Sequence, residues 1–575
     1  MSIKLPSPKQ PDALAENPSP VEIIKDSSDY LRGDITDGLT DNLTGAIGTS
    51  DQTLIKFHGI YQQDNRDVRM ERAARKLEPD YSFMLRLRIP GGLITPAQWL
   101  AVNSVANELT ETGSIRLTTR QTLQFHGIPK ENLRSLVATC EHRLLDSIAA
   151  CGDVNRNVMC TPHAELSPTH TAAYDIATAI SRRLLPATRA YYEIWLGEEN
   201  LTGGITEEPL YGKHYLPRKF KIGIAIPPSN DIDVYSQDIG FVSVVKNNSL
   251  HGFNIIIGGG LGMTHSDTRT YPRVGDDIGF CTPKQAIDVA WHLVAIQRDY
   301  GNRSDRKLSR FKYTVARLGA ATIKAELDKR LGFALEPSVP VQWMHRGDYL
   351  GWHRRPDGKW DLTLFVENGR LAAETSLKNA LSEAAALDCC SLLITPNQNI
   401  MLINIADSDR IRVEAVFSRR KLSIEDNTTL SGLRRNAMAC VSMPTCPLAM
   451  AEAERYMPTL LTRLENEVTT LNLRQNDIII RMTGCPNGCA RPYLGEIGLV
   501  GKSPGRYNLY LGASYGGDRL SSLVGKNLNE EGIVAFLRPL LEKYANQRQD
   551  DERFGDFLVR TGHVKAPQCG ADFHP

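Results

Sequence analysis

Four cysteines occupy two short, proline-marked stretches at a spacing that suits metal binding. Cys440 and Cys446 lie in "ACVSMPTCPLAM", and Cys485 and Cys489 lie in "TGCPNGCARPY". The pattern is C-x5-C, a long spacer (447–484) and C-x3-C. Zinc ribbons usually use C-x2-C knuckles, so this spacing favours the four thiolates of an iron-sulfur cluster over a tetrahedral zinc ion. The spacing alone leaves two alternatives open: zinc, and cysteines that serve only core packing.

The segment after Cys446 has the periodicity of a helix. Pro447 suits a first helical turn, and "LAMAEAERYMPTLLTRLENEV" (448–468) continues the pattern. This predicts that Cys446 lies at a helix N-terminus, where the helix dipole favours a thiolate. Cys389 and Cys390, by contrast, are interpreted as core residues.

Internal repeats divide the chain into related halves. "LRLRIPGGLI" (85–94) aligns with "LTLFVENGRL" (362–371). The same shift along the chain aligns "IRLTTRQTLQFHGI" (115–128) with "LLITPNQNIMLINI" (392–405). One offset that serves both pairs makes a chance match less plausible.

A second repeat connects the cysteine turn to an earlier stretch. In this repeat, "IPPSNDIDVYSQDIGFV" (226–242) aligns with "GCPNGCARPYLGEIGLV" (484–500). Pro227 and Asp231 stand where the later stretch has its two cysteines. Only one half of this repeat therefore carries candidate ligands.

Basic side chains gather in the half that lacks these cysteines. In "IRLTTRQTLQFHG", read as one strand, a single face presents Arg116, Thr118, Arg120, Thr122, Gln124 and His126. Further basic residues are Arg86 in "LRLRIPGG", Arg156 in the "NRN" turn, and Lys219 and Lys221 on one face of "PRKFKIGIAI". Each alone suits a solvated strand face. Together they predict a cationic cavity for a polyanionic cofactor and a small oxyanion.

These motifs carry a family resemblance. The combination of "CVSMPTC", "TGCPNGC", "LRLRIPGG", "RLTTRQTLQFHGI", "NRNVMC" and "PRKFK" closely resembles the hemoprotein (beta) subunits of bacterial NADPH-dependent sulfite reductases, in the sulfite and nitrite reductase superfamily. The resemblance extends over nearly the whole chain, including "YLRGDI" and "FHGIYQQDNRDVR". It implies that Cys440, Cys446, Cys485 and Cys489 hold a [4Fe-4S] cluster, and that Cys489 also bridges the cluster to the iron of a siroheme.

The resemblance also implies roles for the basic residues. Arg116, Arg120, Gln124 and Asn487 match siroheme-binding positions, and Arg86, Arg156, Lys219 and Lys221 match positions that surround sulfite. Arg310, in "NRSDRKLSRFKY", stands where a relative has lysine. The implied reaction is the six-electron, assimilatory reduction of sulfite to sulfide for cysteine biosynthesis. Guanidinium and ammonium groups would orient the anion and deliver protons to its oxygens.

The chain of 575 residues is too long for a single core. Strand patterns alternate with helical stretches, which predicts an α+β fold, and the resemblance implies three domains with an internal pseudo-two-fold repeat. The expected parts are an N-terminal arm (1–80), partly disordered and in contact with a partner; two ferredoxin-like half-domains (81–145 and 346–425); a siroheme- and substrate-binding domain (146–345); and a domain for the cluster and the siroheme ligand (426–575).

Composition limits the partners and the compartment. A net charge of +1 and a pI near 7.6 give no basic excess for nucleic acid. The sequence contains no run of eighteen apolar residues that would predict a membrane span. Because the first residues also lack the apolar core of an export signal, a cytoplasmic location is expected. Scattered cysteines in odd number argue for reduced thiols.

The electron donor is expected on another chain. The nearest match to a dinucleotide-binding motif, "IIIGGGLGM", has a repeat counterpart in "YNLYLGASYGG", which indicates a glycine turn instead. NADPH, FAD and FMN are therefore expected on a separate flavoprotein (alpha) subunit. The alternatives are a ferredoxin-dependent sulfite or nitrite reductase and, from another class, a non-catalytic iron-sulfur electron carrier. The last would explain the cysteines but not the basic strands.

Overall fold

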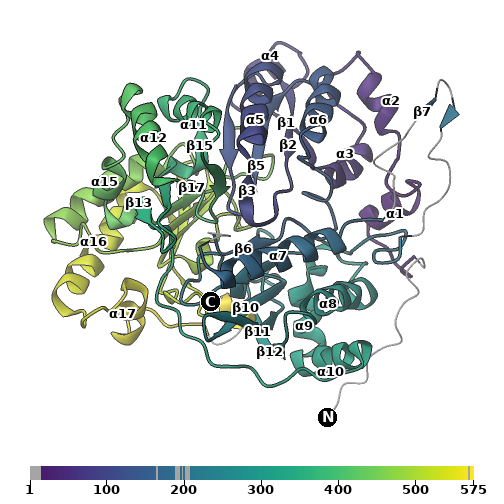
Figure 1. Ribbon diagram of the computed structural model, residues 1–575. Coiled ribbons are helices and arrows are strands. Elements are labelled where there is room, and N and C mark those ends of the chain that lie inside the picture. Colours follow the sequence, from purple (N-terminus) through teal and green to yellow (C-terminus); the bar gives the residue numbers. More distant parts are fainter. Residues whose placement is uncertain are drawn as a thin grey trace.

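The computed structural model describes residues 14–162, 166–187, 195–196, 199–200, 208–567 and 570–574. Within these residues, helices pack around four five-stranded sheets (Figure 1). This confirms the predicted α+β class. The sheets form two related pairs, and each pair corresponds to one of the repeats in the sequence.

The first pair of sheets exchanges strands between its two halves. One sheet has the order β1 (Ile60–Asp64), β2 (Tyr81–Arg86), β5 (Leu123–Ile128), β4 (Ile115–Leu117) and β15 (Arg370–Leu371). The other has the order β13 (Gly351–Arg354), β14 (Trp360–Leu364), β17 (Ile400–Ile405), β16 (Ser391–Ile394) and β3 (Leu93–Ile94). Because β3 and β15 each complete the sheet of the other half, the two halves form one unit.

Related helices cover this unit. Helix α5 (Pro96–Leu109) begins with a capping box in which Thr95 and Gln98 satisfy each other's backbone N–H groups, and α11 (Ser376–Ala386) is capped by Thr375. The other helices here are α6 (Leu133–Glu141) and α12 (Asp407–Arg419). Apolar residues of both halves share one core, from Trp99 in the first half to Leu402 in the second.

The second pair of sheets has one topology used twice. The orders are β12 (Asp276–Cys281), β11 (Ser249–Ile257), β10 (Ile239–Lys246), β9 (Ile222–Ala225) and β6 (Met159–Cys160), and β22 (Ser522–Leu528), β21 (Arg506–Leu511), β20 (Ile497–Ser503), β19 (Ile480–Thr483) and β18 (Ala437–Ala439). In both sheets the three strands that end the order are parallel and the first three are antiparallel. The offset that aligns 226–242 with 484–500 also carries the preceding strand β9 onto β19.

Each of these sheets has its own helices and core. The first packs against α7 (Pro168–Arg183), α8 (Ala286–Tyr300), α9 (Phe311–Leu318) and α10 (Ala320–Leu331). The second packs against α15 (Met457–Thr470), α16 (Glu530–Gln547) and α17 (Phe554–Arg560). Short α13 (Asp426–Thr429) and α14 (Gly432–Arg435) precede β18, and the small hairpin β7 (Trp195–Leu196) and β8 (Glu199–Asn200) stands apart.

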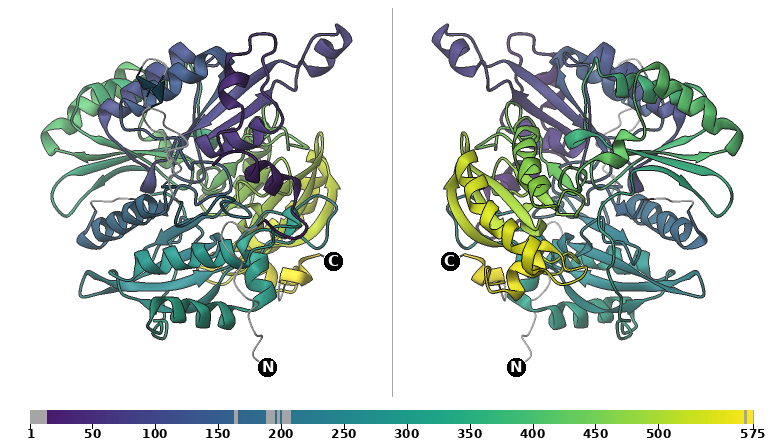
Figure 2. Two further views of the ribbon diagram at one scale, coloured as in Figure 1. Left: turned by 90° about the vertical axis from the view of Figure 1, so that its right-hand side faces the viewer. Right: turned by 90° about the vertical axis from the view of Figure 1, so that its left-hand side faces the viewer.

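The N-terminal segment contains regular elements that pack on the rest of the molecule. Residues 1–13 lie outside the described part, but residues 14–80 contain α1 (Pro20–Asp26), α2 (Ile35–Thr40), α3 (Asp51–Leu54), β1 and α4 (Arg69–Ala74). The predicted arm (1–80) therefore includes helices and a strand from Pro20 onward. Glu22 and Lys25 are buried and paired with each other at 2.5 Å, and Arg303 binds Glu22 at 2.6 Å. These distant partners are invisible to local sequence patterns. Helix α4 projects from the body of the molecule (Figure 2).

Two predicted elements are corrected by the structure. The stretch 115–128 is a hairpin and not one strand, because the backbone reverses between β4 and β5 and Gln121 takes a positive φ of 52°. The predicted helix after Cys446 begins only at Met457. The residues before it instead hydrogen-bond the cysteine turn, since Met450 N donates to Gly484 O at 2.8 Å. Cys446 is therefore not at a helix N-terminus.

Candidate functional site

Two loops at the ends of parallel strands bring the four cysteines to one region. Cys440 follows β18, and Cys485 and Cys489 lie in the turn after β19, the strand beside it. The backbone N–H of Gly484 donates to Cys440 Sγ at 3.4 Å, and Asn487 Nδ2 donates to Cys485 Sγ at 3.6 Å. Donors of this kind stabilise sulfur that carries negative charge.

Gly484 permits the close approach of these loops. A Cβ atom at this position would lie 1.9 Å from Ser442 Oγ and 2.6 Å from Ala451 O, both in the loop that carries Cys446. No side chain can occupy that space, so glycine is required where the two cysteine loops meet.

The thiols form an electrostatic group. Burial raises the pKa of Cys440, Cys446 and Cys485, in the last case to about 12, and the neighbouring Cys489 sulfur raises each of them further. The described residues contain no group of three or more His, Cys, Asp or Glu side chains placed to hold a single metal ion. A four-iron cluster has a different requirement, because each of its irons takes one thiolate. Four thiols that lie in one region without converging on a single ion fit such a cluster better than one zinc ion.

The predicted cofactor and substrate residues of the first half-domain lie side by side on neighbouring strands. Gln124 on β5 stands opposite Arg86 on β2 and opposite Arg116 on β4. With the Gln124 amide turned so that its oxygen faces β2, Arg86 Nε donates to it at 2.8 Å. Arg116 reaches the cysteine domain, where it pairs with Glu454 and donates to Ala439 O at 3.0 Å.

The hairpin correction changes the position of Arg120. It lies in the turn between β4 and β5, and its guanidinium donates to Gln237 Oε1 at 2.8 Å and to Asn157 O at 2.6 Å. Burial, together with neighbouring guanidinium groups, lowers its pKa to about 9 although Asp238 opposes the shift. Its buried Nε has no hydrogen-bond partner among the described residues. A half-buried cation with an unused, buried donor suits an anionic ligand.

A cavity of about 300 Å³ lies beside these residues. Its lining includes three predicted site residues, Lys219, Arg310 and Asn487, and also Arg218, Arg306, Lys307, Gly262, Met263, Thr264, Thr270 and Tyr313. Five of the lining residues are therefore cationic, as a ligand with several carboxylates requires. Asp238, which is fully buried, holds Arg310 at 2.8 Å and accepts from the backbone N–H of Lys221 at 2.9 Å.

The remaining predicted substrate residues lie around this region, with Arg156 buried and Lys219 and Lys221 half-buried. Arg156 donates through Nε to Gly152 O at 2.8 Å. Burial lowers the pKa of Lys219 to about 7, and the nearby guanidinium groups of Arg218 and Arg310 act in the same direction. Burial and the charges of Lys219, Arg120 and Arg310 hold the pKa of Lys221 well below its ordinary value. Such crowding of like charges is costly without a bound anion.

Cys489 connects the thiols to the cations. It is exposed, and its backbone carbonyl accepts from Thr119 Oγ1 at 3.1 Å, in the turn of the β4–β5 hairpin. Its sulfur raises the pKa of the basic residues Arg86, Arg116, Lys219 and Lys221, against the larger effect of burial, which lowers it. One sulfur thus lies within electrostatic range of both groups of predicted site residues.

Several residues of the site were not predicted from the sequence. Arg218 stands next to Lys219 in "PRKFK", and Arg306 and Lys307 lie in the same stretch as Arg310, so clustering of basic residues was an available signal. Asp238 had no such signal, because its role depends on residues far away in the sequence.

Comparisons with known proteins agree with this architecture. A family model described as "Nitrite/Sulfite reductase ferredoxin-like half domain" matches residues 75–142 and 353–417, and one described as "Nitrite and sulphite reductase 4Fe-4S domain" matches 151–335. The four candidate ligand cysteines lie outside these matched ranges. No helix among the described residues is long and apolar enough to span a membrane.

Individual relatives are similar over nearly their full length. The sulfite reductase [NADPH] hemoprotein beta-component of Anoxybacillus flavithermus is 51% identical over 561 residues, which cover 97% of this chain and 98% of the relative. The protein of the same name from Bacillus subtilis is 50% identical over 570 residues, with 98% and 99% covered. The structure of Mycobacterium tuberculosis NirA matches with a TM-score of 0.75 at 22% identity, covering 95% of this chain and 97% of that one, and so shares the fold.

Proposed function

Because the chain belongs to the sulfite reductase hemoprotein beta-component family of oxidoreductases, we propose that it reduces sulfite to sulfide with six electrons. The observation that carries this proposal is the position of Cys489, whose sulfur acts on three other thiols and on four buried or half-buried basic side chains. A plain electron carrier would need the thiols but not the cations.

The residues fit the two cofactors of the proposal. Cys440, Cys446, Cys485 and Cys489 would hold a [4Fe-4S] cluster, and Arg116, Arg120, Gln124, Arg310 and Asn487 would hold a siroheme, with Cys489 shared. Support comes from the cationic cavity of about 300 Å³ and from the unpartnered buried Nε atoms of Arg120 and Arg310. When bound, these groups supply the stored electrons and the iron that takes up the anion.

The side chains of this chain would bind the anion and move protons. Arg86 keeps its charge at every physiological pH, because the pKa of a guanidinium is far above that range and the neighbouring Cys151, Tyr61 and Cys489 raise it despite burial, so it suits anion binding. Lys219, with a pKa of about 7, can give up a proton and regain one near neutral pH. Arg156 and Lys221 complete the proposed substrate group.

We also propose a flavoprotein (alpha) subunit with FAD and FMN as the source of electrons from NADPH. The stretch "IIIGGGLGM" (255–263) supports this. Its glycines follow β11 as a loop and open no helix, whereas a dinucleotide-binding motif places its glycines at the start of a helix. Donor contact through the N-terminal segment is supported by Arg66, which donates to Cys446 O at 3.2 Å and to Ala449 O at 2.7 Å and thereby ties the base of α4 to a cysteine loop. A reducing compartment, the cytoplasm, is proposed because the thiolates must stay reduced.

Electron-donor specificity tests the proposal. The purified chain should show the visible absorption bands of siroheme and should reduce sulfite when reduced viologen is supplied. It should not do so with NADPH until the flavoprotein is added. Absence of siroheme bands from protein loaded with iron and sulfide would favour the electron carrier, and NADPH-driven turnover by the chain alone would overturn the proposed division between subunits.

A further inference from the structure

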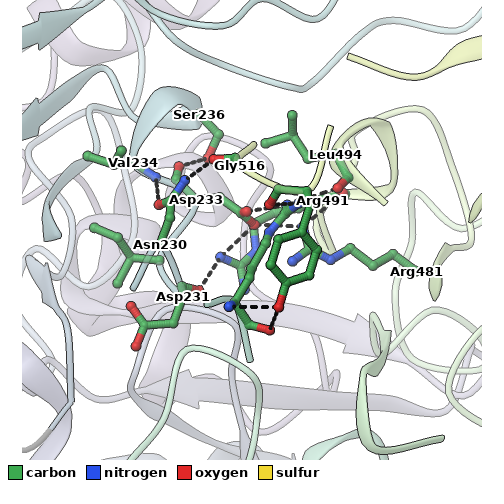
Figure 3. A network of polar contacts seen from close by, with 12 residues as sticks. Asn230, Asp231, Asp233, Val234, Ser236, Arg481, Arg491, Leu494 and Gly516 are labelled. Atoms are coloured by element: carbon green, nitrogen blue, oxygen red, sulfur yellow. Dashed lines mark hydrogen bonds and ion pairs between the residues drawn. The ribbon is translucent and has the colours of Figure 1, made fainter. Parts of the chain in front are cut away.

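One buried carboxylate binds three buried arginines. Asp233 is fully buried, and its Oδ2 lies 2.6 Å from Arg481 Nη1 and 2.9 Å from Arg491 Nη1, while its Oδ1 pairs with Arg346 (Figure 3). Burial alone would raise the pKa of Asp233, but the three guanidinium groups hold it below its ordinary value. The carboxylate is therefore charged, and we call these four residues the Asp233 cluster.

The Asp233 cluster joins parts of the chain that are distant in sequence. Asp233 lies between β9 and β10, Arg481 lies on β19, and Arg346 precedes β13. Arg346 also donates to the carbonyls of Leu494 at 2.8 Å and Ser514 at 3.2 Å. The two repeated domains and the segment between them thus meet at one carboxylate.

Arg491 connects this cluster to both cysteine loops. It lies two residues after Cys489, and its backbone N–H donates to Gly488 O at 3.0 Å, inside the cysteine turn. Its side chain donates to Met438 Sδ at 3.6 Å, two residues before Cys440, and to Pro396 O at 2.6 Å in the second half-domain. The side chain of Arg491 therefore contacts β18 and the second half-domain as well as Asp233.

We propose that Asp233 is a positioning residue for the cysteine turn: by fixing the guanidinium of Arg491, it sets the place of Cys489 relative to the cationic cavity. This rests on the proposed function, since Cys489 is there the sulfur shared by two cofactors. Asp233 itself touches no cysteine and no lining residue of the cavity in any described contact. Its effect must therefore pass through its arginine partners: Arg491, and Arg481 on β19, whose Nη1 donates to Arg491 O at 3.4 Å.

The test compares variants of the full chain, purified with its cofactors. Asp233→Asn keeps the shape of the side chain and removes its charge, and Arg491→Lys keeps the charge but loses the fork of donors. We expect both to bind iron and sulfide, to show shifted siroheme absorption and altered electron paramagnetic resonance of the reduced cluster, and to lose at least tenfold of viologen-driven sulfite turnover. Asp233→Glu should restore part of the wild-type spectrum.

Arg346→Met is the matched control, because Arg346 shares the carboxylate but bonds to Leu494 and Ser514 and to no cysteine loop. It should unfold at a lower temperature while keeping wild-type spectra.

Wild-type spectra and turnover in Asp233→Asn or Arg491→Lys would overturn the proposal. An equal spectral change in Arg346→Met would also overturn it, because the Asp233 cluster would then be a general support of the fold. If Asp233→Asn does not fold, Arg491→Lys decides alone. A wild-type protein without siroheme bands would instead refute the proposed function.

Discussion

Asp233 and Arg491 are equivalent positions of the repeat that bind each other. The alignment of 226–242 with 484–500 places one on the other, and they have similar left-handed φ angles of 52° and 58°. Each directly precedes a short 3₁₀ turn, Val234–Ser236 and Pro492–Leu494. Their side chains meet as an ion pair at 2.9 Å. The repeat therefore brings equivalent backbone turns close together. Because the two equivalent positions carry opposite charges, their side chains attract each other.

Stability should respond unequally to the members of this cluster. Asp233→Ala leaves three buried guanidinium groups without their carboxylate and should cost about 3–5 kcal/mol. Arg481→Met leaves Asp233 with two partners and removes one charge-assisted bond, so it should cost about 1.5–3 kcal/mol. Urea denaturation followed by circular dichroism measures both. Equal losses would mean that Asp233 has no central role.

Repeats made most of the fold predictable. The alignment that places 85–94 on 362–371 also places β5 on β17 and β3 on β15, and the structure confirms both equivalences. Sequence comparison could not show that β3 and β15 cross to the other half, because strand exchange depends on tertiary pairing. The position of α15 was misjudged for a related reason: residues 447–456 have helical periodicity, but their backbone groups bond to the cysteine turn.

The candidate site was predictable where residue types cluster in the sequence. Lys219 was identified within a cluster of basic residues, and Arg310 and Asn487 through the family resemblance; all three line one cavity. Asp238 and Asp233 were not, since a single aspartate in a loop has no distinguishing pattern until its arginine partners are known. The opposite charges at Asp233 and Arg491 were nevertheless visible in the repeat alignment.

Loss of one cysteine should remove the cluster. In Cys446→Ser the hydroxyl is a poor iron ligand at neutral pH, so iron and acid-labile sulfide per chain should fall to a small fraction of the wild-type content. Cys389→Ser is the control, because Cys389 is half-buried in the second half-domain. Full iron and sulfide content in Cys446→Ser would remove this residue from the ligand set.

Sulfite affinity should depend on pH through Lys219. Burial lowers its pKa to about 7, so above this pH the free site holds a neutral amine and must take up a proton to bind an anion. Affinity should then fall as pH rises above 7, by up to about tenfold per pH unit. Spectral titration with sulfite at several pH values measures this. Lys219→Met should bind sulfite weakly at pH 6.5. The pH dependence of its affinity should be only that caused by the protonation of sulfite itself. An unchanged slope would assign the titration to another group.

Lys312 should control cofactor occupancy from behind the cavity. Its fully buried ammonium donates to the carbonyls of Gly260 at 3.2 Å and Gly262 at 2.7 Å, and to that of Tyr271. The loop it holds touches the cysteine turn, since Met263 N donates to Pro486 O at 2.9 Å. A Cβ at Gly262 would lie 3.2 Å from the carbonyl oxygen of Asn487. Lys312 therefore anchors the wall shared by the cavity and the cysteine turn.

Lys312→Met leaves these buried carbonyls without their donor, which destabilises the loop by about 1–3 kcal/mol for each unsatisfied group. We expect siroheme content per chain to fall severalfold, measured by visible absorption, with faster hydrogen exchange at residues 258–263. Lys312→Arg should not restore the siroheme content, because the larger guanidinium does not fit the fully buried position of the Lys312 side chain. Lys307→Met is the control: Lys307 also lines the cavity, but its side chain is half exposed and supports no loop carbonyl in the described contacts. Equal siroheme loss in both variants would point to cavity charge, and not to the loop, as the cause.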